Sequence, residues 1–195
     1  MAQRQDRLHQ RKANLLKGLA AGVIAGAAAA VVMNQFQKLC SRLLIGEERS
    51  HGAQSLQKGA PHRGAGKMLE RGGAEDPNDD SAERLAQTVS VGIFDHKLTE
   101  QEKDKAGTAF HYGFGISMGA VYGAAAEIIP EATFCEGLPY GALIWMGADE
   151  LVVPALGLSK AGDEYPASIH AAALGAHLVY GLTLESVRNL IRNIL

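Results

Sequence analysis

The sequence has few of the residues that build small disulfide-rich, metal-bound or nucleic-acid-binding domains. It holds two cysteines and one tryptophan, and aromatic residues make up 6% of the chain. Two cysteines exclude a disulfide scaffold and a cysteine-rich zinc module. The formal net charge of −2 leaves no basic excess to attract nucleic acid. The chain also lacks a His-Glu-x-x-His metal motif and a phosphate-binding Gly-Lys-Ser/Thr loop. We therefore expect no metal, no cofactor and no enzymatic activity.

Long uncharged runs are what the sequence has instead. They cover 18–33, 106–126, 137–158 and 165–184, and within them Asp149-Glu150 is the one charged break. A bilayer core of about 30 Å needs about 20 helical residues. Four such runs in 195 residues are difficult to place in a soluble core, whose helices keep a polar face. We therefore predict an all-α fold, an integral membrane bundle of four antiparallel transmembrane helices.

The predicted organisation has five parts. They are a basic cytoplasmic tail (1–14), a first transmembrane helix (15–36), a flexible connection (37–79), short amphipathic helices (80–105) and a three-helix membrane core (106–195) with helices at about 106–129, 137–158 and 166–188. A cleaved signal peptide is the alternative for the first helix, because a basic segment precedes small residues. A retained helix is favoured, since Val31-Val32-Met33 continue the apolar run where a cleavage site would need a polar start.

Glycines recur every four residues in the first two runs. They are Gly18, Gly22 and Gly26 in the first run and Gly115, Gly119 and Gly123 in the second. An interior glycine costs a helix in water about 1 kcal/mol relative to alanine. In lipid, small residues at this spacing form a flat stripe that lets two helices approach closely. We interpret both stripes as helix-packing surfaces of glycine-zipper type.

The positions of lysine and arginine predict the orientation. Arg11 and Lys12 precede the first run, and Arg188 and Arg192 follow the last. Basic flanks favour the cytoplasmic side, and an even number of spans puts both termini there. Cys40 then follows the first helix outside, whereas Cys135 lies inside between the second and third. We therefore expect two free thiols, because a disulfide needs its two Cα atoms within about 7 Å.

The connection between the first two runs divides into two parts. Gly46 to Asn78 is rich in glycine and charge, and we expect it to be disordered. Asp80 with Glu83, and Thr99 with Glu102, have the spacing of helix-capping boxes. These two pairs predict one helix beginning near Ser81 and another beginning near Glu100.

A series of short elements in the C-terminal half resembles a known family. In order they are Ala120-Val121-Tyr122, Ala126-Glu127, Pro130, Gly137-Leu138, Gly141-Ala142-Leu143, Pro154, Gly157-Leu158, Gly175, His177-Leu178-Val179, Glu185 and Arg188. Together they make 110–193 resemble the YagU family of bacterial inner-membrane proteins, an uncharacterised multi-span family. The resemblance implies a location in the bacterial inner membrane and a helical membrane fold. It supplies no reaction.

Ionisable residues inside the predicted spans are the candidate functional residues, because each is costly in lipid unless paired or hydrated. Counting about 1.5 Å per residue puts Asp149, Glu150 and His177 near the bilayer midplane. The matched depth of Glu150 and His177 predicts that these two form the polar centre of the bundle, with Asp149 as the competing acid. Structural pairing alone is the alternative interpretation of this cluster.

Two further sets lie nearer the membrane surfaces. His111 and His170 fall near the outer face, where they are hydrated histidines or, as a minor alternative, haem or metal ligands. Glu127, Glu185 and Arg188 fall near the inner face, where anchoring is the ordinary role.

Two functional hypotheses follow. The first is an inner-membrane protein that handles protons or a small polar solute through the acid–histidine cluster. The second is a structural or assembly module without a substrate. The expected partners are the lipid bilayer and, in either case, a second copy or another membrane protein; no nucleic acid is expected. The substrate, the oligomeric state and the role of the long connection do not follow from the sequence.

Overall fold

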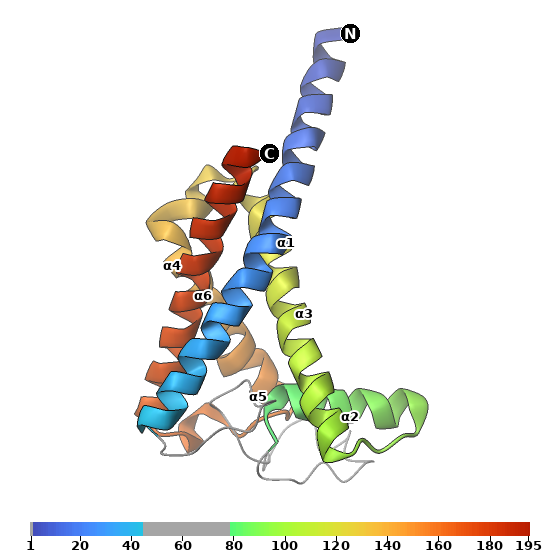
Figure 1. Ribbon diagram of the computed structural model, residues 1–195, viewed down its shortest axis with the longest axis vertical. Helices are drawn as coiled ribbons and strands as arrows, with labels where there is room; N and C mark the ends of the chain where they lie inside the picture. The colour runs from blue at the N-terminus through green and yellow to red at the C-terminus, as the bar shows by residue number, and fades with distance from the viewer. Residues whose placement is uncertain (1, 45–78) are drawn as a thin grey trace. The chain divides into compact units, whose positions relative to one another are not determined.

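The structure, a computed structural model, describes residues 2–44 and 79–195, and every regular element in these ranges is a helix (Figure 1). Along the chain the elements are α1 (Ala2–Leu44), α2 (Ser81–Phe94), α3 (Glu100–Ala126), the 3-10 helix η2 (Pro130–Gly137), α4 (Leu138–Ile144), the π-helix η3 (Trp145–Val152), α5 (Val153–Ala155), the 3-10 helix η4 (Gly162–Glu164) and α6 (Ala167–Ile194). The all-α fold class is confirmed for the described residues.

Helix α1 is longer than the transmembrane helix expected at 15–36. It takes in most of the basic tail and continues to Leu44, eight residues into the expected flexible connection. Good helix formers in the added turns, such as Lys38, Leu39 and Arg42, explain the extension. The stretch expected to be disordered, 46–78, lies outside the described residues.

Both predicted capping boxes are confirmed. Asp80 Oδ1 accepts the backbone N–H groups of Ala82 (2.9 Å) and Glu83 (3.0 Å), and Glu83 Oε2 accepts the N–H of Asp80 (2.7 Å). At the next junction Glu102 Oε2 accepts the N–H of Thr99 at 2.8 Å. These bonds satisfy donors that a helix start leaves unpaired, so they fix where α2 and α3 begin.

The expected third span, 137–158, changes helix type along its length. A short α4 runs without a gap into the π-helix η3 and then into α5, which ends at Ala155. The N–H of Val153 bonds the carbonyl of Ala148, five residues back, as a π-helix requires. Pro154 has no N–H to donate, which removes an ordinary α-helical bond at this point. The helix therefore unwinds where the sequence carries Asp149 and Glu150.

The chain forms two compact units. Among the described residues, unit 1 comprises 2–33, 112–142 and 178–195, and unit 2 comprises 34–44, 79–111 and 143–177. Helices α1, α3 and α6 each contribute to both. The candidate acid–histidine residues Asp149, Glu150, His170 and His177 all belong to unit 2.

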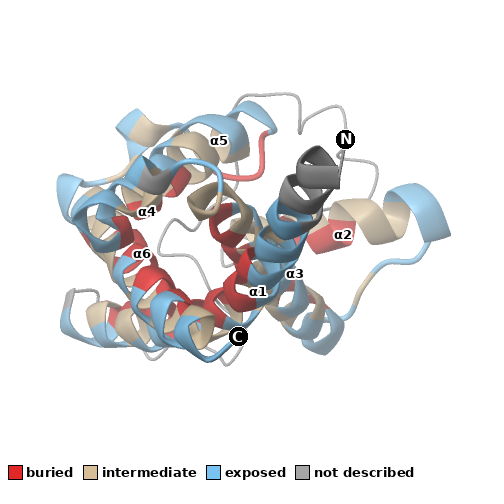
Figure 2. Cartoon of the chain, turned by 90° about the horizontal axis from the view of Figure 1, so that it is seen from above, coloured by how far each residue is buried: buried red, intermediate tan, exposed pale blue. Residues whose placement is uncertain are grey.

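Small residues fill unit 1 where α1 passes through it. Ala21, Ala25 and Ala29 are fully buried on one face of α1, whereas Ile24 and Val31 are about half exposed on another (Figure 2). A soluble helix shows the reverse, with its large apolar side chains inward. Exposed aliphatic side chains around a core of small residues fit contact with lipid.

The glycine stripes of α1 and α3 meet inside unit 1. A Cβ added to Gly26 would lie 2.8 Å from the carbonyl oxygen of Gly115, and one added to Gly119 would lie 2.5 Å from that of Gly22. A Cβ on Gly18 would lie 2.5 Å from the carbonyl oxygen of Gly123. Real Cβ atoms do not approach that closely, so the two backbones touch where glycine permits it.

Two helices of the described chain are long and apolar enough to cross a membrane. They are α1 over Gln10–Leu43 and α6 over Ala167–Ile194. The other two expected spans differ: α3 opens with charged turns before its apolar part, and the helical stretch within 137–158 is π-helical in its middle and ends at Ala155. The structure supports membrane association through two helices.

The two cysteines are both free, as predicted. Cys40 on α1 is half-buried, and Cys135 in η2 is exposed. Cys135 belongs to a turn in which it, Glu136 and Gly137 all have positive φ angles, which brings the chain from η2 into α4.

Candidate functional site

Two consecutive carboxylates on η3 face two histidines on α6 in unit 2. Asp149 and Glu150 lie in the π-helix, and His170 and His177 are seven residues apart on α6. Seven residues make two helical turns, so both histidines share one face of α6, about 10 Å apart along its axis. The π-helix and α6 thus present two acid–histidine pairs along one seam.

Glu150 pairs with His170. Glu150 Oε1 lies 2.7 Å from His170 Nδ1, and His170 Nε2 lies 2.8 Å from the carbonyl oxygen of Gly162. A carbonyl oxygen only accepts, so Nε2 carries a proton. The contact between Nδ1 and the carboxyl group also needs a proton between them, carried by one or the other. In this geometry the Glu150–His170 pair holds two protons, one on Nε2 and one between Nδ1 and the carboxyl group. A neutral imidazole beside a carboxylate would hold only one.

Asp149 faces His177 at a greater distance. Asp149 Oδ2 lies 3.8 Å from His177 Nδ1, and this nitrogen donates to the carbonyl oxygen of Ala173 at 3.0 Å. The side chains are 23% and 7% exposed, respectively. Because Nδ1 is the donor, Nε2 of a neutral His177 keeps its lone pair and can accept a proton. The Asp149–His177 pair is therefore more widely spaced than the Glu150–His170 pair, and Nε2 of a neutral His177 can accept a proton.

The predicted pairing of Glu150 with His177 is wrong in this structure, and Asp149 takes that place. Residue counting gave depth along the helix but not rotation about it, and adjacent residues point about 100° apart. The π-turns change that rotation further. The helix also ends at Ala155 rather than at 158, so that Glu150 lies close enough to the end of the helix to meet His170.

His170, one of the two histidines offered as a minor haem or metal site, uses both of its ring nitrogens in hydrogen bonds, to Glu150 and Gly162. The other, His111, lies on α3. Among the residues that the structure describes, no group of three His, Cys, Asp or Glu side chains could hold a metal ion.

The predicted inner-face residues form two ion pairs in unit 1. Arg188 Nε and Nη2 each lie 2.7 Å from a carboxylate oxygen of Glu185, and both side chains are more than nine-tenths buried. Glu127, in the turn that follows α3, pairs with Arg192 on α6 at 2.6 Å. Sequence reasoning placed Glu127 beside Arg188 and missed Arg192, which lies one helical turn further on the same face.

Buried tyrosines accompany these ion pairs and were also missed. The ring of Tyr122 is fully buried and lies 4.7 Å from that of Tyr140, centroid to centroid. Its hydroxyl lies beside the Glu185 carboxylate without a hydrogen bond of ordinary geometry. On α6, Tyr180 donates to the carbonyl of Gly115 at 2.6 Å. The sequence signal that could have found Tyr122 and Tyr180 is the small residues that surround them in the apolar runs.

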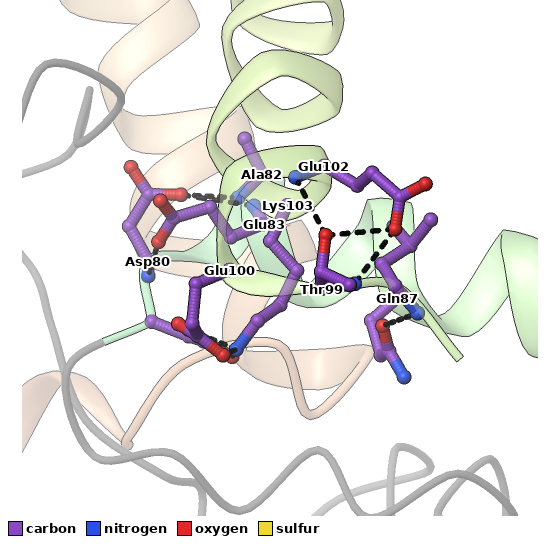
Figure 3. A network of polar contacts seen from close by, with 10 residues as sticks. Asp80, Ala82, Glu83, Gln87, Thr99, Glu100, Glu102 and Lys103 are labelled. Carbon is purple, nitrogen blue, oxygen red and sulfur yellow. Dashed lines mark hydrogen bonds and ion pairs between the residues drawn. The ribbon is translucent and has the colours of Figure 1, made fainter.

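A second polar network joins α2 to α3 in unit 2 (Figure 3). Lys103 bridges Asp79 (2.9 Å) and Glu100 (2.8 Å). Glu83 is 5% exposed and packs over Gly107, and its carboxyl group lies within hydrogen-bond reach of that of Asp104. Burial raises the pKa of Glu83 to about 7, and the charge of Asp80 adds to this rise. The network lies outside the predicted membrane segments.

One further pattern has the form of a catalytic motif. Gly115, Ser117 and Gly119 match the Gly-x-Ser-x-Gly spacing of a nucleophile elbow. That elbow requires a strand-to-helix turn, whereas this segment lies within α3, where the Ser117 hydroxyl donates to the carbonyl of Gly113 at 2.8 Å. Its glycines pack against α1, so the pattern here belongs to helix packing.

Comparison with known proteins gives a family but no characterised relative. The family model described as a protein of unknown function (DUF1440) matches residues 58–186. The match begins well before the segment 110–193 that carried the sequence resemblance, and it takes in α2 and most of α6. Neither the curated proteins nor the solved structures gave a match.

Proposed function

The chain belongs to the DUF1440 family of proteins of unknown function, and we propose that it is an integral membrane protein that handles protons through two acid–histidine pairs. One observation carries this proposal. Consecutive carboxylates on a π-helix face two different histidines, with Glu150 at 2.7 Å from His170 and Asp149 at 3.8 Å from His177. Ionisable residues within apolar helices are functional candidates by default and mark proton relays and polar pathways in known membrane proteins, and π-helical turns are frequent at functional sites.

The proposed setting is a four-helix bundle in the bacterial inner membrane, with both termini in the cytoplasm and a YagU-like architecture. Helices α1 and α6 would be joined in the bilayer by the apolar part of α3 and by the segment from α4 to α5. The glycine contacts between α1 and α3 support a glycine-zipper seam, because their backbones touch at three levels. The basic residues flanking α1 and α6 support the orientation.

The chemistry would be proton transfer between neighbouring carboxyl groups. The Glu150–His170 pair holds a proton in the observed geometry, and His177 offers an acceptor nitrogen on the same face of α6. Two adjacent carboxylates in a poorly solvated position disfavour both being ionised at once. A proton leaving one pair therefore makes it easier for the other pair to gain one, and the seam would take up and release single protons. A small polar solute that carries a proton would use the same groups.

Proton flux into liposomes holding the purified protein tests this function. With an internal pH-sensitive dye and an imposed pH gradient, the wild type should collapse the gradient faster than empty liposomes. Asp149→Asn and His177→Gln should each slow it by about tenfold or more, because each removes a proton-holding group. Glu131→Gln, which neutralises an exposed acid in η2, is the matched control and should leave the flux unchanged.

A structural membrane module is the second candidate, and specific contacts favour it. The touching glycines and the buried Glu185–Arg188 and Glu127–Arg192 pairs would serve assembly alone. This alternative predicts no flux above that of empty liposomes. It also predicts that Asp149→Asn is neutral or raises the melting temperature, because an uncharged amide avoids the cost of burying a carboxylate. Flux that depends on Asp149 would exclude it.

A further inference from the structure

The short segment 159–165 lies against the Glu150–His170 pair and is held together by its own hydrogen bonds. Ser159 Oγ donates to the carbonyl of Lys160 at 3.0 Å, and the N–H of Lys160 donates to the Tyr165 hydroxyl at 3.2 Å. The N–H of Ala161 donates to Glu164 Oε1 at 3.3 Å, closing the turn of η4. The segment is therefore a compact turn, closed by its own hydrogen bonds, between α5 and α6.

Gly162 is the point where this segment touches the pair. Its carbonyl oxygen accepts from His170 Nε2 at 2.8 Å, and a Cβ placed on it would lie 3.1 Å from Glu150 Oε2. The ring of Tyr165 stands edge-on to that of His170, with centroids 6.2 Å apart. His170 is thus enclosed by a carboxyl group on one side and by this segment on the other.

We propose that segment 159–165 is a gate over the Glu150–His170 pair, closed while the pair holds its proton and released when the proton leaves. The inference rests on the proposed function, whose site it regulates. The Gly162 carbonyl is the positioning group: by accepting from Nε2 it fixes the ring so that Nδ1 faces Glu150. The position of the gate and the protonation of the Glu150–His170 pair therefore depend on the same proton.

The coupling follows from counting protons. With the proton present, His170 satisfies Glu150 and the Gly162 carbonyl together. Without it, a ring that keeps Nε2–H bonded to Gly162 turns the lone pair of Nδ1 toward a carboxylate, and two acceptors repel. A ring that turns to offer its N–H to Glu150 instead leaves the Gly162 carbonyl without its donor. The second arrangement is favoured, because a hydrogen bond to a carboxylate is stronger than one to a neutral carbonyl. Loss of the proton therefore costs the Gly162 contact that holds the segment down.

Other charged groups lie beside this pair in the chain. Asp149 precedes Glu150 on η3, and its carboxylate lies 3.8 Å from His177 Nδ1 on α6. The segment carries Lys160, Asp163 and Glu164, of which Glu164 is engaged with Ala161. A negative Asp149 disfavours a second negative charge on Glu150 and so favours the proton-holding, closed state.

Spin-label mobility in the lipid-reconstituted protein tests the gate. In a background of Cys40→Ser and Cys135→Ser, Asp163→Cys carries a nitroxide on the exposed side of η4. As pH rises, the mobile component of the spectrum should grow from a minority to a majority over about 2 pH units, as for one titrating proton. The same label at Glu131→Cys, in η2, should show no such step.

Two variants should abolish the pH step in opposite ways, one by keeping the label immobile and the other by keeping it mobile. Glu150→Gln supplies an N–H to His170 Nδ1 at every pH, so the label should stay immobile throughout. His170→Phe removes both contacts, so the label should be mobile throughout. A pH step that persists in both variants, or no step in the otherwise unaltered protein, would overturn the gate. If the label behaves as expected but liposomes show no flux, the gate stands and the proton-handling function falls; flux without a pH step gives the reverse.

Discussion

Polar side chains in this protein are placed by partners that lie far away in the sequence. Asp149 and Glu150 are neighbours in the chain, yet one faces His177 and the other His170. The sequence was sufficient to identify all four residues, because ionisable groups stand out in apolar runs. It was not sufficient to pair them, since spacing gives depth in a helix whereas pairing depends on rotation, which the π-helix alters.

Glu83 gives a pH-dependent prediction at the residue scale. Its pKa is raised from 4.5 to about 7 by burial, so the folded protein binds this proton more tightly than the unfolded chain does. The resulting stability is complete below about pH 4.5 and is lost as pH rises through 7. Glu83→Gln stays neutral, keeps an acceptor for the Asp80 N–H and donates to Asp104. It should therefore stabilise the protein at pH 8 by about 1–3 kcal/mol, with little effect at pH 4.5.

Thermal unfolding in detergent at pH 4.5 and pH 8 measures this difference. Glu102→Gln is the matched control in the capping box of the next helix, α3, because the hydrogen bond from the Thr99 N–H lowers the pKa of Glu102. Its contribution has the opposite sign: it is present at neutral pH and is lost as pH falls through the folded pKa. If the melting temperature of Glu83→Gln changes with pH as that of the wild type does, Glu83 is not the buried acid that lowers stability at high pH.

The helices themselves were predictable where a local signal marks their ends. The boxes Asp80–Glu83 and Thr99–Glu102 set the starts of α2 and α3, since capping is decided within four residues. The π-helical turns of η3 were not predicted. Pro154 is compatible with several local geometries, and the choice of a π-helix depends on tertiary contacts that no local pattern encodes.

Glycine contacts between α1 and α3 give a prediction at the element scale. A Cβ on Gly119 would lie 2.5 Å from the carbonyl oxygen of Gly22 and 2.6 Å from the Cα of Gly26. Since these neighbours are backbone atoms, Gly119→Ala must separate the two helices. We expect a loss of about 1–3 kcal/mol, measured as a lower melting temperature in detergent.

Gly113→Ala is the matched control on the same helix. Nothing lies within 4 Å of a Cβ at that position, so alanine should be neutral or stabilise α3 by up to about 1 kcal/mol. Equal effects of the two substitutions would mean that the contact between the stripes does not hold α1 and α3 together.

At the scale of the whole chain, the distribution of side chains is the main physical argument for a membrane protein. In the described residues, alanine and polar groups such as Asn34, Gln37 and Glu185 are buried, whereas Leu39, Leu43 and Leu190 are more than half exposed. Water would penalise this arrangement and lipid favours it. The uncharged runs of the sequence already indicated the membrane; which side each end occupies stays a prediction.

The account depends most on where the protons of the two histidines lie, and nitrogen NMR of the histidine rings in lipid observes them directly. We expect His170 to keep a proton on Nε2 at every pH at which the gate is closed, and to lose its titration step in Glu150→Gln. His177 should carry its proton on Nδ1 when neutral, with Nε2 bare. Signals assigned through His170→Gln and His177→Gln that show a bare Nε2 on His170, or a titration of His170 that Glu150→Gln leaves unchanged, would contradict the account.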